Sequence, residues 1–242
     1  MIIYVPDFYP RFRCIADRCR HTCCVGWEID IDPGTLAQYR KTGGPTGQKL
    51  RRSIALSPEP HFLLTDGERC PFLTDRNLCE LIMQGIPLCQ ICADHPRFRN
   101  YWSDREEMGL GLACEEAARI ILASPSPLRL IPLGEDEEEE ETPSEEELAL
   151  RRYRDRLIAS VWETGPLARL REYLLYRHLA DALYDGRVEE RIRFTDLAFH
   201  QIADGWDGDL ETLIERARRF SNEVEYDDEK LESSLSNTPG FT

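Results

Sequence analysis

The chain has 242 residues, of which 41% are hydrophobic and 31% are charged, values typical of a folded globular protein. Its formal net charge of −15 argues against binding to nucleic acids or anionic membranes, because phosphate contacts need clustered Lys and Arg side chains. The sequence shows no apolar run of the ~18 residues that span a bilayer and no leader peptide. We therefore expect a cytoplasmic protein that binds neither nucleic acid nor membrane, and whose oligomeric state the sequence leaves unknown.

The first part of the chain, residues 1–124, predicts short and irregular elements. Residues 31–44 favour a helix that begins after an Asp32 cap and ends at two glycines. Residues 61–70 favour a strand followed by an Asp-Gly turn, and residues 78–92 favour a short helix broken by Gly and Pro. With so few long elements, the stability of this part is expected to depend on its cysteines.

A strand, a helix and a linker are expected next along the chain. Residues 105–114 alternate Met, Leu and Leu with other residues, which predicts a strand, and residues 114–124 predict a helix. Residues 125–147 combine Pro-containing sequence with a run of acidic residues from Glu135 to Glu141. Like charges repel and bury no apolar area, so this segment is predicted to be a solvated linker.

The last part of the chain, residues 148–242, is predicted to be helical. Apolar residues recur at helical spacing in four segments, residues 144–162, 166–186, 195–204 and 209–225. Ser144 and Glu147 form a capping box for the first segment, and Thr195 is a candidate cap for the third. The predicted fold is therefore α+β and mostly α, with an irregular, cysteine-rich, metal-binding N-terminal part (1–124) followed by a helical C-terminal part.

Cysteine is confined to the first part of the chain. The nine cysteines are Cys14, Cys19, Cys23, Cys24, Cys70, Cys79, Cys89, Cys92 and Cys114. The first four fall within eleven residues, and Cys89 with Cys92 forms a CxxC turn. Disulfides are rare in the cytoplasm, and an odd count excludes complete pairing.

Metal binding is the chemistry that this pattern favours. Thiolate is a soft ligand that selects zinc, copper(I) or iron–sulfur clusters, and such sites usually take four ligands. We therefore predict that all nine cysteines are metal ligands, enough for two four-ligand sites, although spacing alone does not assign ligands to sites or choose the metal. The alternative is that the cysteines are buried and pack as small hydrophobic residues. The charged neighbours Arg18, Arg20 and His21 argue against such packing in the first group.

The cysteines and the residues around them resemble those of a known protein family. The cysteine-rich start resembles the signature of the flagellin lysine-N-methylase family, within a wider group of CxxCxxCC zinc- or iron-chelating domains, in the stretch FRCIADRCRHTCCVGWEIDID. Later segments resemble that family in the same order, namely RCPFLTDRNLCELI, LCQICADHPR, GLGLACEEAARIIL, YLLYRHLADALYDGRVEERIRF and RRFSNEVEYDDEKLESSL. The resemblance spans nearly the whole chain, which is shorter than typical members.

The resemblance implies an enzyme that transfers a methyl group from S-adenosylmethionine to lysine side chains of flagellin. It also implies an iron–sulfur cluster, of the 4Fe-4S type, with zinc as the alternative metal. A lysine amine has a reference pKa near ~10.4, so the enzyme must deprotonate it before transfer. A non-catalytic zinc- or iron-binding structural module is the competing hypothesis, and an electron-transfer protein is a third.

Five residues near the cysteines are candidates for further roles. Glu28, Asp30 and Glu115 are weak candidates for the base that takes the lysine proton. Trp27 is a candidate for cation–π contact with a methyl donor, and Arg97 for contact with an anionic cluster. The alternatives are structural: a core position for Trp27, a solvated strand face for Asp30, a helix first turn for Glu115, and a salt bridge for Arg97.

Overall fold

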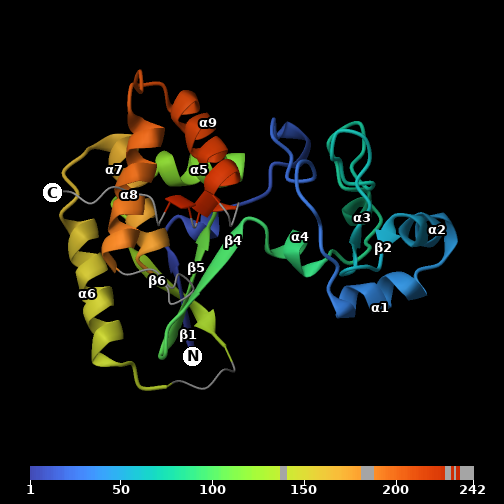
Figure 1. Ribbon diagram of the computed structural model, residues 1–242, viewed down its shortest axis with the longest axis horizontal. Coiled ribbons are helices and arrows are strands. Elements are labelled where there is room, and N and C mark those ends of the chain that lie inside the picture. The colour runs from blue at the N-terminus through green and yellow to red at the C-terminus, as the bar shows by residue number, and fades with distance from the viewer. Residues whose placement is uncertain (137–140, 181–187, 227–229, 232, 235–242) are drawn as a thin grey trace. The chain divides into compact units, whose positions relative to one another are not determined.

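The computed structural model in Figure 1 describes five stretches of the chain, residues 1–136, 141–180, 188–226, 230–231 and 233–234. The fold is α+β and mostly helical, which confirms the predicted class. None of the helices formed by these residues is long and apolar enough to cross a membrane.

The chain folds as two units. Unit 2 is the continuous segment Cys14–His95, and unit 1 combines Met1–Arg13 with Pro96–Thr242. The sequence analysis instead placed a boundary at residue 124. The difference arises because strands that follow Pro96 pair with the first strand of the chain, a long-range pairing that no local pattern records.

Unit 1 contains a four-stranded sheet with the strand order β4-β5-β1-β6. Its strands are β1 (Ile2–Pro6), β4 (Arg97–Tyr101), β5 (Arg105–Leu110) and β6 (Leu130–Glu135). Strand β1 runs parallel to β5 and antiparallel to β6, and β4 runs antiparallel to β5. Strand β5 is the predicted alternating segment.

Strand β6 corrects part of the linker prediction. It lies within residues 125–147, yet its backbone pairs with β1 from Leu130 to Glu135. An edge strand pairs on one side only, so it tolerates the Pro132 and Gly134 that made this segment resemble a linker. Residues 137–140, in the middle of the acidic run, lie outside the described residues.

The described part of unit 1 also contains five α-helices, which lie beside and above the sheet in Figure 1. They are α5 (Glu115–Leu122), α6 (Glu145–Ala159), α7 (Gly165–His178), α8 (Val188–Ala203) and α9 (Leu210–Phe220), the last continuing into the π-helix η3 (Ser221–Glu225). Helices α6, α7, α8 and α9 contact one another in that order, and α5 contacts α7 and α9. Their apolar faces form the unit 1 core with the sheet and with the short 3-10 helix η1 (Tyr9–Arg11) nearby.

The two predicted caps in the helical part had different outcomes. The Ser144 hydroxyl accepts a hydrogen bond from the Glu147 amide at 3.1 Å, as the capping box predicts. Thr195, in contrast, lies inside α8, and its hydroxyl donates to the Arg191 carbonyl at 2.9 Å. The cap prediction for Thr195 was wrong because a buried threonine in a helix can satisfy its hydroxyl on the preceding turn. The helix predicted over 166–186 ends earlier, at His178 with Leu179 as its C-cap, and the predicted stop at residue 186 lies outside the described residues.

A close contact in the sheet gives the first testable prediction. Gly109 in β5 pairs directly with Phe98 in β4, and a Cβ at Gly109 would overlap the Phe98 ring. Because Phe98 is itself packed in the core, Gly109→Ala is expected to lower the free energy of unfolding by about 1–3 kcal/mol. Urea unfolding measures this loss. The matched control is Gly134→Ala in β6, where a Cβ meets no atom within 4 Å and unit 1 should keep its stability.

Unit 2 is built from short elements. They are η2 (Ala16–Arg18), α1 (Pro33–Lys41), α2 (Gly44–Arg52), β2 (Ile54–Ala55), β3 (His61–Phe62), α3 (Glu80–Met83) and α4 (Gln90–Asp94). Helix α1 confirms the predicted helix with its Asp32 cap. The predicted turn is present at Gly67, whose φ of 72° suits glycine. A unit of this size buries a smaller fraction of its surface than a large domain, so additional cross-links add much to its stability.

Candidate metal centre

Cysteine thiols form part of the unit 2 core. Cys70 and Cys89 are buried there, together with Tyr39, Phe62 and Phe72, whose rings pack in series at centroid distances of 6.0 and 5.2 Å. Three more cysteines pack against the same core. We call the five residues Cys24, Cys70, Cys79, Cys89 and Cys92 the thiol cluster.

The thiol cluster draws on four segments of unit 2. The Cys70 amide donates a hydrogen bond to the Cys24 carbonyl at 2.8 Å. This bond joins the segment that contains Cys23 and Cys24 to the segment that begins at Cys70. Cys79 immediately precedes α3, and its carbonyl accepts from the Met83 amide at 3.1 Å. Cys89 precedes α4 and Cys92 lies within it. Short helices therefore present two of the segments, and backbone pairing presents the other two.

The thiols influence one another electrostatically. Burial, in spite of a hydrogen bond from the Phe72 amide and with smaller contributions from nearby Cys24, Cys79 and Cys89, raises the pKa of Cys70 to about 12. The hydrogen bond with Cys89, burial, and the charges of Cys89, Cys24 and Cys70 all raise the pKa of Cys92. Burial likewise raises the pKa of Cys79. The five thiols therefore lie close enough together to oppose one another's ionisation.

Two members of the cluster favour the thiolate instead. A hydrogen bond from Cys23 lowers the pKa of Cys24 to about 7 against the effect of burial, with help from Thr22 and Arg69. A hydrogen bond from Cys92 lowers the pKa of Cys89. The cluster thus combines thiols whose pKa is lowered with thiols whose pKa is raised, and a cation would favour ionisation of the second kind. A soft metal ion is such a cation.

Two further residues of unit 2, Tyr39 and Asp32, support the cluster. The Tyr39 hydroxyl donates to the Pro87 carbonyl at 2.8 Å and lies 3.5 Å from the Cys89 sulfur. Asp32 accepts from the Thr35 amide at 2.8 Å and from the Gln90 amide at 2.9 Å. Asp32 therefore caps α1 and also holds the start of α4, directly after Cys89. Its capping role was readable from the sequence, but its link to the CxxC turn is a tertiary contact.

The Asp32 contacts give a second prediction. Asp32→Ala should lower the stability of unit 2 by about 1 kcal/mol, the usual cost of removing a helix N-cap. Hydrogen bonds from the Thr35 and Gln90 amides lower the pKa of Asp32, so its contribution is present above its unfolded pKa and is lost as pH falls through the lower native value. Thermal unfolding between pH 3 and pH 7 measures both effects. Asp30→Ala, an exposed neighbour, should leave the melting temperature unchanged; equal losses in both variants would exclude the capping role.

The fit of a metal to these residues rests on donor chemistry. Five thiol sulfurs from four segments are the donors that zinc and iron–sulfur clusters prefer. Within the described residues, however, no set of three or more His, Cys, Asp or Glu side chains is arranged as a group that could hold a metal ion. Metal ligation by the nine cysteines therefore stays a prediction, and the thiol cluster is the part of the chain where the donors gather.

The other four cysteines have different surroundings. Cys14 and Cys23 are exposed, and the Cys19 thiol lies 3.1 Å from the His21 carbonyl. Cys114 belongs to unit 1, where it precedes α5 and packs against the helical core. The structure thus places eight of the predicted ligands in unit 2 and one in unit 1.

The two predicted cofactor contacts have structural roles. Trp27 is half-buried against the unit 2 core, and its indole nitrogen donates to the Cys23 carbonyl at 2.7 Å. Arg97 is the first residue of β4 in unit 1; its Nε donates to the Tyr9 hydroxyl at 2.9 Å, and its guanidinium lies over the Phe12 ring. Trp27 therefore packs against the core as its alternative described, whereas Arg97 contacts Tyr9 and Phe12 through a hydrogen bond and a cation–π interaction rather than through the salt bridge that its alternative described.

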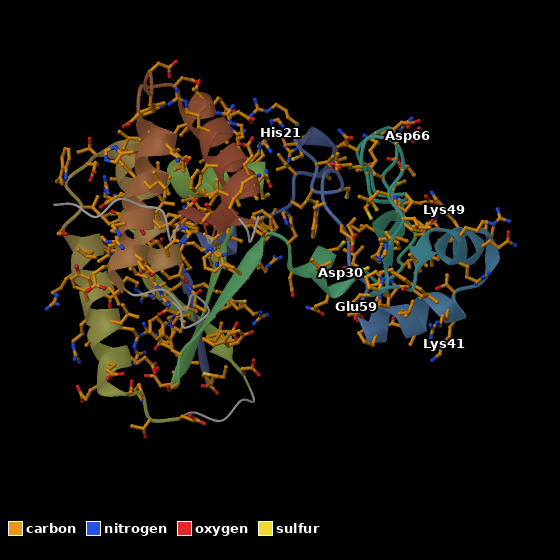
Figure 2. All side chains as sticks on the ribbon, in the orientation of Figure 1. His21, Asp30, Lys41, Lys49, Glu59 and Asp66 are labelled. Atoms are coloured by element: carbon orange, nitrogen blue, oxygen red, sulfur yellow. The ribbon has the colours of Figure 1, made fainter. Side chains whose placement is uncertain are left out.

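The three candidate bases differ in exposure. Glu28 and Asp30 are exposed on unit 2, where Figure 2 labels Asp30. The Glu28 carboxylate lies 4.0 Å from the ring of His61 in β3. Glu115, by contrast, is buried in unit 1 and paired with Arg119 at 3.4 Å. Only the first two carboxylates are open to a cation arriving from solution.

Comparison with curated proteins finds several that are similar in sequence to this chain. A lysine-N-methylase of Salmonella typhimurium is 29% identical over 141 residues, and one of Salmonella choleraesuis is 28% identical over 141 residues. The flagellar biosynthetic protein FliU of Salmonella muenchen is 26% identical over 134 residues. The chain is homologous to these lysine-N-methylase and FliU proteins. This finding agrees with the family resemblance of its cysteine-rich segments.

The extent of the similarity is limited. Each match covers 52% of this chain, less than the nearly complete resemblance that the sequence motifs suggested. The matched region spans only 33% of the length of each lysine-N-methylase, but 79% of the length of FliU. No family model and no solved structure matches the chain.

Proposed function

We propose that this protein methylates lysine side chains of flagellin, with S-adenosylmethionine as the methyl donor, in the cytoplasm. The observation that carries the proposal is the homology to proteins named lysine-N-methylase and FliU. The acidic composition supports it, because a chain with a net charge of −15 attracts lysine-bearing surfaces.

The reaction makes two demands on the protein. The substrate ammonium must lose a proton, and its nitrogen lone pair must then attack the methyl carbon in line with the breaking carbon–sulfur bond. Glu28 and Asp30 are exposed carboxylates that can receive the ammonium and accept its proton. Glu115 is less suited to this role, because Arg119 already neutralises it within unit 1.

A cysteine-held iron–sulfur cluster is the second part of the proposal. The thiol cluster would hold it, with Cys24, Cys70, Cys79, Cys89 and Cys92 as the ligand candidates. An iron–sulfur cluster supplies electron-transfer chemistry and cross-links the segments that ligate it. The contribution of this chain to such a site is to position the thiols, through α3, α4, Tyr39 and Asp32.

A methylation assay tests the proposal. The full chain, purified without oxygen, is incubated with flagellin and S-adenosylmethionine carrying a labelled methyl group, and methyl-lysine is measured by mass spectrometry. We expect methyl-lysine with the protein and background labelling with a Glu28→Gln/Asp30→Asn variant. Absence of transfer by protein that contains iron and sulfide would overturn the enzymatic function.

A structural metal module is the second candidate function. The short elements of unit 2 and the thiols within its core favour this possibility. Zinc without sulfide in the purified protein, together with no methyl transfer, would establish the module. Elemental analysis and the methylation assay therefore separate the two candidates.

A further inference from the structure

A pocket in unit 1 lies apart from every residue that the proposed function uses. It has a volume of about 450 Å³. Its walls come from β1, β5, α6, α7 and the segment that leads into β6, and the residues that line it are Tyr4, Arg105, Pro127, Leu128, Arg129, Leu130, Arg154, Asp155, Ile158, Ala159 and Tyr176. This volume is in the range of sites that bind small organic molecules. We call it the arginine pocket.

The charged residues of the pocket are mostly positive, in a chain that is otherwise strongly acidic. Arg105, Arg129 and Arg154 line it, and Asp155 is the acidic residue among the lining side chains. Behind the wall, the buried Glu107 carboxylate pairs with both Arg105 and Arg154. The side chains that line the pocket therefore carry three guanidinium groups and one carboxylate.

The arginines differ in how fully their donors are used. Arg154 has no exposed surface and directs its donors at Glu107 and Asp155, at distances from 2.7 to 3.3 Å. The Nε of Arg105 is buried and has no hydrogen-bond acceptor among the described residues. Arg129 is exposed and has no ion-pair partner within the described part of the chain. The Arg105 side chain is 22% exposed, so Arg129 and the exposed part of Arg105 are the guanidinium surface that a bound anion can reach.

The rest of the pocket is apolar or aromatic. Leu128, Leu130 and Ile158 contribute aliphatic surface, and Pro127 and Ala159 extend it. The Tyr4 ring lies 5.2 Å from the Arg105 guanidinium, so it holds that side chain at the wall by cation–π contact. Apolar surface beside a guanidinium pair matches a ligand with a hydrophobic body and an anionic head.

We propose that the arginine pocket binds a small organic anion. Its carboxylate or phosphate head is held by Arg105 and Arg129, because guanidinium donors match the geometry of both groups. Its apolar body lies against Leu128, Leu130 and Ile158.

Titration calorimetry on the full chain tests the proposal with simple probes. Phenyl phosphate and benzoate carry a phosphate and a carboxylate head on the same aromatic ring. The compound that binds with the higher affinity identifies the preferred head group. Benzylamine carries the opposite charge on that ring, and inorganic phosphate carries the charge without the ring. We expect saturable binding of at least one aromatic anion, at least tenfold weaker binding of inorganic phosphate, and no binding of benzylamine.

Variants place the binding in the pocket. Arg129→Ala should weaken the binding of the preferred anion about tenfold, the usual effect of losing one charge-assisted hydrogen bond. Arg105→Lys, which keeps the charge but lacks the planar guanidinium group, should weaken it by a similar factor. Arg152→Ala on α6 is the matched control, because its side chain is 61% exposed and lies outside the pocket.

Three results would overturn the proposal. They are no saturable binding of either aromatic anion, equal affinity of the wild-type protein and Arg129→Ala, and benzylamine binding as tightly as the anions. Because Arg129 is exposed, its variant is expected to fold normally, and an unchanged urea unfolding curve verifies this. The test therefore does not depend on the outcome for Arg105→Lys.

Discussion

Glu107→Ala is expected to lower the free energy of unfolding of unit 1 by about 3–5 kcal/mol, because it removes the buried counter-charge of the Arg154 guanidinium and leaves it only the exposed Asp155 carboxylate. The Glu107 and Arg154 side chains have no exposed surface. Two hydrogen bonds join them, at 2.7 and 3.1 Å, and Arg105 makes a further ion pair with the same carboxylate. Urea unfolding followed by circular dichroism measures the loss.

The same ion pair predicts a pH dependence. Burial acts to raise the pKa of Glu107, but the charges of Arg154 and Arg105 outweigh it and hold this pKa below its ordinary value. The stabilisation is therefore fully present above the unfolded pKa, near ~4.3, and is lost as pH falls through the lower native pKa. The wild-type protein should lose stability over this acidic range more steeply than Glu107→Ala does.

Two variants control the Glu107 experiment. Arg152→Ala removes an exposed charge on α6, 3.9 Å from Glu145, and should change stability by less than about 0.5 kcal/mol. The double variant Glu107→Leu/Arg154→Met should recover most of the loss, because it removes both fully buried charges and leaves only Arg105, which is 22% exposed, without its Glu107 partner. A Glu107→Ala protein as stable as the wild type would contradict the interpretation of this ion pair.

Cys89→Ser/Cys92→Ser is expected to abolish metal binding and to unfold unit 2. Both residues belong to the thiol cluster, and Cys89 is fully buried in the unit 2 core. Structural zinc in small domains contributes about 10–16 kcal/mol of apparent binding free energy, which is comparable with the whole stability of a typical domain. Metal analysis and hydrogen exchange of residues 14–95 measure the two losses.

The other cysteines offer matched controls for that variant. Cys14→Ser changes an exposed thiol, and Cys114→Ser changes a thiol in unit 1. We expect both proteins to keep their metal, since neither thiol belongs to the cluster. Loss of metal in these variants, with retention in Cys89→Ser/Cys92→Ser, would assign the ligands elsewhere and exclude the thiol cluster as the site.

Local sequence patterns predicted the elements whose signals are local. The Asp32 and Ser144 caps, the alternating strand β5 and the helix α5 each follow from residues within a few positions of one another. Thr195 shows the limit of such signals, since a threonine before an apolar run serves equally well inside a helix. Burial, which decides between these possibilities, is a tertiary property.

The sequence alone could not predict how the chain divides into units or which cysteines form the thiol cluster. β1 pairs with β5 across a separation of about a hundred residues, and only that pairing assigns Met1–Arg13 to unit 1. Likewise, spacing marked all nine cysteines alike. Backbone contacts such as Cys70 to Cys24 and the Tyr39 hydroxyl at Cys89 distinguish the five that gather. The arginine pocket combines residues from distant segments, so no motif marked it.

Metal content combined with hydrogen exchange tests the central claim, that sulfur-held metal organises unit 2. Iron, sulfide and zinc are measured in the full chain purified without oxygen, and exchange is followed before and after chelation. The account predicts bound metal, and a loss of amide protection on chelation that is confined to residues 14–95 while the core of unit 1 stays protected. A chelated, metal-free protein that protects residues 14–95 as well as before would contradict it.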